Sequence, residues 1–173
     1  MNSNDKEVTV TQISMFSVPK EDRYFEDYVV GSVYEFGTIA VTEDEVIDFA
    51  KRYDPQSFHI DPETAKKSRF GGIISSGWLT AGLAMRLLVD NYISSVASLG
   101  SPGVNDLKWL KPVRPGDELS IKVTNLDTRR SRSKPNQGTV HIFLETLNQK
   151  REVVMTMQSV GMILCRDSVA RIG

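Results

Sequence analysis

One apolar segment of this chain predicts its architecture: Ser75-Ser76-Gly77-Trp78-Leu79-Thr80-Ala81-Gly82-Leu83-Ala84-Met85-Arg86-Leu87-Leu88. The two serines stand where helix caps are preferred. The pattern continues to about Val96, and Arg86 and Asp90 are its only charged residues. A helix of about twenty residues is roughly 30 Å long. Because this one is apolar on most sides, we expect it to be buried as the central helix of the domain.

The segments that flank this helix have the composition of strands. The run over 33–41 is rich in apolar residues, follows Gly31 and contains Gly37. We expect it to be a strand with a bulge at Gly37. Four more runs cover 103–110, 118–126, 138–147 and 153–164. The last two are joined by Asn148-Gln149-Lys150-Arg151, which is short enough for a hairpin, so these two should be antiparallel. Strand, short helices, long helix and strand meander together predict an α+β fold with an antiparallel sheet.

Two short helices are predicted between the first strand and the long helix. Thr42-Glu43-Asp44-Glu45 has the spacing of a capping box, and Asp54-Pro55 should end the helix that it starts. Asp61-Pro62 repeats the start signal, with aspartate as the N-cap and proline at the first helical position. That second helix should run to about Lys67.

Length and composition limit the class of protein. With 173 residues the chain is long enough for one domain with its own core. A formal net charge of -1 gives no general attraction to nucleic acid or to a membrane surface. The single cysteine, Cys165, excludes an intrachain disulfide framework, and the default compartment is a reducing cytoplasm. We expect no structural zinc site, because one cysteine and two distant histidines do not supply it.

The first twenty residues are expected to be an N-terminal extension, with the domain covering 21–173. Residues 1–20 lack the basic start and the continuous apolar core of a secretory signal. The chain also has no run of about 18 apolar residues that would span a membrane. Among the scattered apolar residues of this extension, Ile13, Met15 and Phe16 could pack on a partner subunit.

The stretch Tyr53-Asp54-Pro55-Gln56-Ser57-Phe58-His59-Ile60-Asp61 concentrates groups that can transfer protons. Pro55 disfavours helix at Asp54, so a turn can fold Asp54 and His59 toward one point. A carboxylate and an imidazole that share one water form a usable acid/base pair near neutral pH. The alternative is structural, with Asp54-Pro55 as a turn, Asp61 as a helix cap and His59 as a packing residue.

These residues carry a resemblance to the MaoC-like dehydratases, a group that includes the (R)-specific enoyl-CoA hydratases. The family motif reads Asp-x-Asn-Pro-x-His-x-Asp, and Asp54, His59 and Asp61 match its charged positions. Ala65 and Phe70-Gly71 follow in step, and the turn over 111–117 is similar to the one before the family's next strand. The likeness covers about residues 24–166 and implies a hot-dog fold, in which the antiparallel sheet wraps around the long helix.

The chain departs from the family pattern at three positions. Gln56 stands where asparagine is usual, Ser57 where proline is usual, and Ser76 where histidine is usual. The first change keeps an amide, whereas the second removes a rigid turn residue and could loosen the geometry of the aspartate and the histidine. Both proton-transfer positions are retained.

The resemblance implies a reaction and roles for particular residues. The reaction is the reversible addition of water to a trans-2-enoyl-CoA, which gives a (3R)-hydroxyacyl-CoA, and an acyl-carrier-protein thioester is the other possible substrate. Asp54 would act as the base and His59 as its partner, or the two would share both tasks. The backbone N–H of Gly77 would stabilise the thioester oxygen, because a helix N-terminus offers unpaired donors. The resemblance also predicts four substrate-binding residues, namely Gln56, Phe58, Ser76 and Trp78.

One dense basic cluster lies between two predicted strands. It contains Arg129, Arg130, Arg132 and Lys134. A solvated loop is one interpretation, and nucleic-acid binding is another, although no aromatic residues are interleaved with the charges. The arginines could instead bind the phosphates of coenzyme A through charge-assisted bonds.

The remaining aromatic and imidazole groups have structural interpretations. His141 is expected to be an ordinary sheet residue, on the same strand face as Thr139 and Phe143. Trp109 lies in a segment predicted to be buried, and core packing is favoured over a pocket. For Trp78 the two interpretations are balanced, because it follows the expected oxyanion position directly.

The fold class also predicts an assembly and leaves two rival functions open. A single sheet layer leaves an edge uncovered, so we expect a homodimer or a higher homo-oligomer. A hot-dog thioesterase would use the same substrates, and a non-catalytic acyl-thioester-binding or dimerisation module is the second rival. No metal, nicotinamide or flavin motif is visible, and no cofactor is expected.

Overall fold

The computed structural model describes residues 12–167 of the chain. Its strands and α-helices are, in chain order, β1 (Val33–Ala40), α1 (Glu43–Tyr53), α2 (Ser57–Ile60), α3 (Pro62–Lys67), α4 (Gly77–Asn91), β2 (Gly103–Trp109), β3 (Glu118–Arg130), β4 (Gln137–Leu147) and β5 (Val153–Leu164). Two 3₁₀ turns, Lys20–Asp22 and Phe25–Asp27, precede β1. The predicted α+β order is therefore confirmed.

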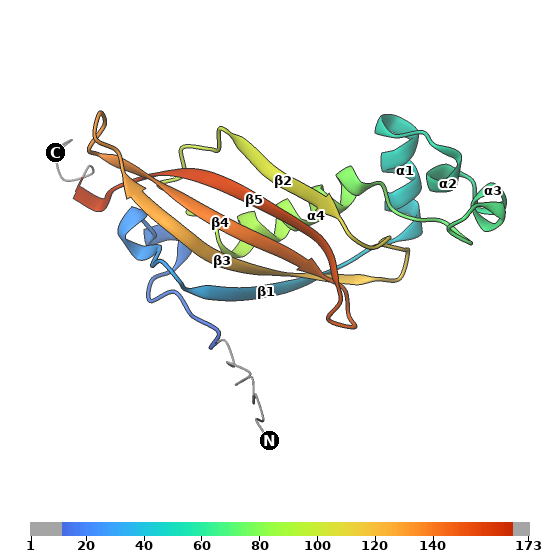
Figure 1. Cartoon of the computed structure of the whole chain (residues 1–173), viewed down its shortest axis with the longest axis horizontal. Coiled ribbons are helices and arrows are strands. Elements are labelled where there is room, and N and C mark those ends of the chain that lie inside the picture. The colour runs from blue at the N-terminus through green and yellow to red at the C-terminus, as the bar shows by residue number, and fades with distance from the viewer. Residues whose placement is uncertain (1–11, 168–173) are drawn as a thin grey trace, which may run out of the picture.

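The five strands form one antiparallel sheet in the order β1-β3-β4-β5-β2. Figure 1 shows this long, curved sheet with α4 lying along it, while α1, α2 and α3 gather at one end. Strands β4 and β5 are joined by the short turn that predicted their hairpin. The bulge expected in β1 is also present, since the register with β3 shifts between Phe36 and Ile39 and Gly37 has a φ of 68°.

The core lies between the inner face of the sheet and one side of α4. Side chains alternate along β3, so that Leu119, Ile121 and Val123 are fully buried. From α4, Leu83 and Leu87 belong to the same core cluster. A side chain at position 37 would meet Leu87, so Gly37 allows the helix to approach β1 closely.

Two expectations for the long helix are wrong. First, α4 ends at Asn91 rather than near Val96. The buried Arg23 donates to the carbonyl groups of Asn91 and Tyr92, at 3.0 and 2.7 Å, and its positive charge suits a helix C-terminus. Tyr28 also donates to the Tyr92 carbonyl at 3.2 Å. These long-range bonds satisfy the last carbonyls and end the helix.

Second, α4 is not buried on all sides. Its exposed face carries Trp78, Met85 and Val89, each at least 45% exposed. The neighbouring edge strand β2 exposes Val104 and Trp109. Within residues 12–167 no helix is long and apolar enough to cross a membrane.

The segment before residue 20 contacts the domain through Phe16. The Phe16 ring stacks on Tyr34 at 4.2 Å between ring centroids, and the Arg23 guanidinium lies over the same ring. Ser14 donates its backbone N–H to Val33 at 2.6 Å. Ile13 and Met15 remain exposed. Of the predicted extension over 1–20, residues 1–11 lie outside the described part of the chain.

Candidate active site

The acid/base stretch lies at the end of the sheet where α1, α2 and α3 gather (Figure 1). Asp54 caps the C-terminus of α1 with φ of -149° and ψ of 65°, so the chain turns at Asp54-Pro55 as predicted. The turn leads into α2, a single helical turn that the sequence did not predict. His59 lies on this turn and is buried. The sharp turn therefore brings Asp54 and His59 together.

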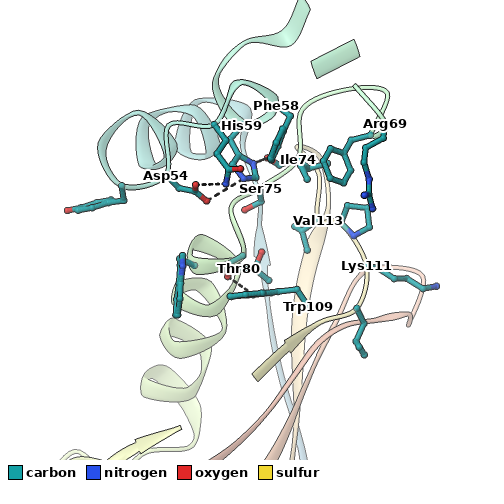
Figure 2. Close-up of a pocket in the computed structure, with 17 residues that line it drawn as sticks. Asp54, Phe58, His59, Arg69, Ile74, Ser75, Thr80, Trp109, Lys111 and Val113 are labelled. Carbon is teal, nitrogen blue, oxygen red and sulfur yellow. Dashed lines mark hydrogen bonds and ion pairs between the residues drawn. The ribbon is translucent and has the colours of Figure 1, made fainter. Parts of the chain in front are cut away.

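Asp54 and His59 form a close pair. The distance between His59 Nε2 and Asp54 Oδ2 is 3.4 Å, and His59 Nδ1 lies 2.7 Å from the Ile74 carbonyl oxygen (Figure 2). A carbonyl oxygen can only accept, so Nδ1 must carry a proton. The other ring nitrogen, Nε2, is therefore the one that faces the Asp54 carboxylate.

Two further side chains hold the Asp54 carboxylate. Gln56 Nε2 donates to Oδ1 at 2.8 Å, and Ser76 Oγ donates to Oδ2 at 2.7 Å. Partial burial raises the pKa of Asp54, but the bonds from Gln56 and Ser76 and the nearby His59 outweigh it and lower the pKa below its ordinary value. Asp54 is therefore a carboxylate at neutral pH, with the charge needed to accept a proton.

Ser76 was predicted to bind substrate, and the structure gives it a different contact. Its side chain is completely buried, and it is absent from the pocket wall, where Ser75 takes that place. Besides donating to Asp54, Ser76 Oγ accepts the backbone N–H of Trp78 at 3.3 Å, as an N-cap does. One hydroxyl therefore links the start of α4 to the carboxylate.

Gly77 is the first residue of α4 and borders the pocket. Within residues 12–167 no acceptor is recorded for its backbone N–H, as the oxyanion prediction requires. Glycine at position 77 is required by a neighbour within the same chain. The Trp109 ring occupies the position of a side chain there, and Trp109 Nε1 donates to the Gly77 carbonyl at 2.9 Å.

These groups border a pocket of about 550 Å³. Of the predicted residues, Asp54, His59, Gly77, Gln56, Phe58 and Trp78 line it. The sequence interpretation missed Arg69, Ile74, Thr80, Leu110, Lys111 and Val113. The turn over 111–117 had been recognised as a turn, but nothing in the sequence placed it beside the motif. No group of three or more metal-binding side chains occurs in the described part of the chain.

The prediction that Trp109 packs in the core is wrong. Trp109 is 46% exposed and Trp78 is 59% exposed, and both border the pocket. Their rings meet edge to face at a centroid distance of 5.3 Å. The edge position of β2 explains the exposure, because no further strand within residues 12–167 pairs with its outer edge.

The predicted phosphate-binding arginines lie elsewhere in the chain. Arg129 and Arg130 end β3, and Arg132 follows in the hairpin to β4, at the end of the sheet opposite α1, α2 and α3 (Figure 1). Arg130 is held by Asp167 at 2.8 Å and by the Pro135 carbonyl at 2.7 Å. Within one chain these arginines do not meet the pocket.

His141 lies in β4, where it pairs with β3 and β5.

Comparison with known proteins gives the family. The family model described as MaoC like domain matches residues 27–146. The Bacillus subtilis protein YdeM, which is uncharacterised, is 33% identical over 125 residues, which is 72% of this chain and 87% of YdeM. A MaoC-like dehydratase from Rhodospirillum rubrum is 37% identical with a TM-score of 0.76, over 83% of this chain and 98% of that chain.

The fold also has a match among more distant structures. A Mycobacterium tuberculosis protein with a double hot-dog fold is 13% identical with a TM-score of 0.70, over 86% of this chain and 46% of that chain. Such low identity shows the fold alone. The sheet order, the position of α4 and these matches together confirm the predicted hot-dog fold. The chain belongs to the MaoC-like dehydratase family.

Proposed function

We propose that this protein is an acyl-thioester hydratase, which adds water reversibly to a trans-2-enoyl thioester and gives the (3R)-hydroxyacyl product. The observation that carries the proposal is the Asp54–His59 pair, held 3.4 Å apart in a pocket that also contains the start of α4. The family membership supports hydratase or dehydratase chemistry in general. The resemblance of the motif to the (R)-specific hydratases supports the stereochemistry.

Proton transfer in this reaction needs one acceptor and one donor. Asp54 accepts a proton from water while the water oxygen bonds to the β-carbon of the substrate. His59 supplies a proton from Nε2 to the α-carbon, and the proton on Asp54 then passes to His59, so both groups return to their starting states. The lowered pKa of Asp54 suits an acceptor at neutral pH.

Negative charge develops on the thioester oxygen while the β-carbon is attacked. The backbone N–H of Gly77 would donate to this oxygen, because the first N–H groups of a helix have no partner within it. The positive end of α4 adds to the stabilisation. Gln56, Phe58 and Trp78 would then contact the acyl group or the water from the pocket wall.

A homodimer is part of the proposal. Strand β2 is a sheet edge with unpaired backbone groups, and apolar side chains of β2 and α4 are exposed beside it. Pairing of two β2 edges across a two-fold axis would cover both features. The pocket would then lie near the subunit interface, because Trp78 and Trp109 belong to both surfaces.

Hydration and hydrolysis of a thioester can be separated in one assay. Loss of the enoyl absorbance and release of free thiol are followed together for a panel of short and medium enoyl-CoAs. A hydratase removes the absorbance without releasing thiol. Thiol release would assign the protein to the thioesterases, and catalytic inactivity on the whole panel would favour a binding module.

Two substitutions and one control connect the activity to the pair. Asp54→Asn and His59→Ala should each lower kcat by at least about 100-fold, the lower end of an acid/base contribution. Asp61→Asn makes the same chemical change in the same motif, at a residue that caps α3 and does not line the pocket. Because asparagine is also a good N-cap, this control should retain activity within about threefold. Equal losses in Asp54→Asn and Asp61→Asn would contradict the assignment of Asp54.

A further inference from the structure

The charged residues of the pocket wall are separated into two groups. Asp54 and His59 lie on one side, and Arg69 and Lys111 lie on the opposite side in Figure 2. Asp54 is the only carboxylate among the lining residues, so the far side of the pocket carries two cations and no anion. Ile74 and Val113 lie between the two groups (Figure 2).

The two cations come from separate loops that are fixed to each other. Arg69 lies between α3 and α4, and Lys111 lies between β2 and β3. Arg114 joins the loops, because its guanidinium donates to the carbonyls of Phe70 and Ile73 at 2.5 and 3.4 Å. Its backbone N–H is held by Asp117 at 2.8 Å. Both loops therefore keep one arrangement around the pocket.

The Arg69 charge is available to a ligand. Its guanidinium lies over the Phe70 ring at 5.1 Å from the centroid, and no acidic partner is recorded for it among residues 12–167. Lys111 Nζ contacts Glu152 Oε1 at 2.7 Å, but both side chains are at least 40% exposed. An exposed ion pair of this kind is weak, so a phosphate can replace Glu152 as the partner of Lys111.

We infer that Arg69 and Lys111 form a subsite for the phosphate on the pantetheine arm of a thioester substrate, an inference that rests on the proposed function. With the thioester oxygen at Gly77, the arm would cross the pocket past Val113 to the two cations. Pantetheine itself is uncharged and suits the stretch between the two groups. A guanidinium and an ammonium are the side chains that hold phosphate through charge-assisted bonds.

Three crotonyl thioesters that differ only in their carrier test the subsite: crotonyl-CoA, crotonyl-4′-phosphopantetheine and crotonyl-pantetheine, which has no phosphate. Arg69→Gln and Lys111→Gln should each raise KM for crotonyl-CoA about tenfold and leave kcat within about twofold, because a charge-assisted bond that only binds is lost. KM for crotonyl-pantetheine should stay within about twofold. An equal rise in KM for that substrate would overturn the inference.

The phosphopantetheine thioester identifies which phosphate Arg69 and Lys111 bind. A tenfold rise in its KM as well assigns the subsite to the phosphate next to pantetheine, which coenzyme A and carrier proteins share. A rise for crotonyl-CoA alone assigns the subsite to the phosphates of the nucleotide. The first result supports the inference, and the second would overturn it.

One control variant and one competing pair complete the test. Lys66→Gln removes an exposed cation three positions before Arg69 that does not line the pocket, and the KM of this variant should not change. Arg129→Gln and Arg132→Gln test the cluster that the sequence suggested. A rise in KM in these two variants, without one in Arg69→Gln and Lys111→Gln, would refute the inference.

Direct binding separates this inference from the proposed reaction. If none of the three thioesters is hydrated by the unmodified protein, the hydratase proposal fails, and calorimetric titration with coenzyme A still tests the subsite. Binding that weakens about tenfold in Arg69→Gln and in Lys111→Gln would support it. Equal binding in all variants, or no binding to the unmodified protein, would overturn it.

Discussion

At the scale of single residues, Ser76 connects two features that the sequence treats separately. Its hydroxyl donates to the Asp54 carboxylate at 2.7 Å and accepts the N–H of Trp78 at 3.3 Å. The family pattern has histidine at this position, so the small serine changes what surrounds the base. Because the bond is made to the charged form of Asp54, it contributes to the lowered pKa of that group. We therefore expect Ser76 to be a positioning residue that acts through Asp54.

The pH dependence of kcat/KM tests this role. Ser76→Ala removes one bond to the carboxylate, which raises the pKa of Asp54. Asp54 is then protonated at a higher pH, so the acid limb of the profile of kcat/KM should move to higher pH. Gln56→Ala removes the bond to the other oxygen and should shift the limb in the same direction without removing a side-chain capping bond, since Gln56 makes none at the start of α2.

Stability measurements keep the two contacts of Ser76 apart. Loss of the N-cap in Ser76→Ala should cost about 1 kcal/mol in the free energy of unfolding. Ser76→Thr keeps a hydroxyl and should restore most of the pH profile. If Ser76→Ala loses stability while its acid limb stays in place, Ser76 serves only as a cap.

At the scale of elements, the start of α4 is fixed by the end of β2. Trp109 is the last residue of that strand, and its ring covers the position that a side chain of Gly77 would occupy. Its indole N–H also donates to the Gly77 carbonyl. The orientation of the first N–H groups of the helix therefore depends on a residue 32 positions away.

Gly77→Ala tests this contact through the sign of its effect. Helix propensity alone predicts that alanine stabilises this first helical position, by at most the roughly 1 kcal/mol found at internal positions. Overlap with Trp109 should reverse the sign and destabilise the protein by about 1–3 kcal/mol. Chemical denaturation measures the change, and kcat should fall with it because the helix start moves.

A double-mutant cycle gives the matching control. In a Trp109→Leu background the overlap is relieved, so Gly77→Ala should cost clearly less than it does in the unmodified protein. Additive effects of the two substitutions would mean that Trp109 does not restrict position 77.

At the scale of the whole molecule, the surface formed by α4 and β2 exposes several large apolar side chains. The exposed side chains of α4 and β2 adjoin the open sheet edge, and they include Trp78, Met85, Val89, Val104 and Trp109. A contiguous patch beside an unpaired edge is typical of a protein interface. The pocket borders this patch, so assembly and substrate binding should be coupled.

Light scattering tests the dimer. The protein should have about twice the 19.4 kDa mass of one chain. Val89→Asp places a charge within the patch and should shift the equilibrium toward the monomer by at least about tenfold in Kd. Val29→Asp makes the same change at a valine of similar or greater exposure that lies before β1, and this variant should remain dimeric. Equal dissociation in both variants would contradict this interface.

The elements of the fold could be predicted because they depend on neighbours in sequence. Proline, glycine and capping residues fixed the bounds of α3, and alternating apolar residues located β3, β4 and β5. Asp54 and His59 could be paired because they are five positions apart across one turn. Position 91, where α4 ends, could not be predicted, since Arg23 and Tyr28 bind its last carbonyls from a distant part of the chain.

The sequence by itself determined the order of the elements, the family and the proximity of Asp54 and His59, since each depends on local spacing that does not need the rest of the fold. Only the tertiary structure placed Trp109 over Gly77 and brought Arg69 and Lys111 to one pocket. It also placed Arg129 at the other end of the sheet. The physical reason is that strand order and register decide which distant side chains meet, and these are set by burial of the whole core around α4 rather than by any short segment.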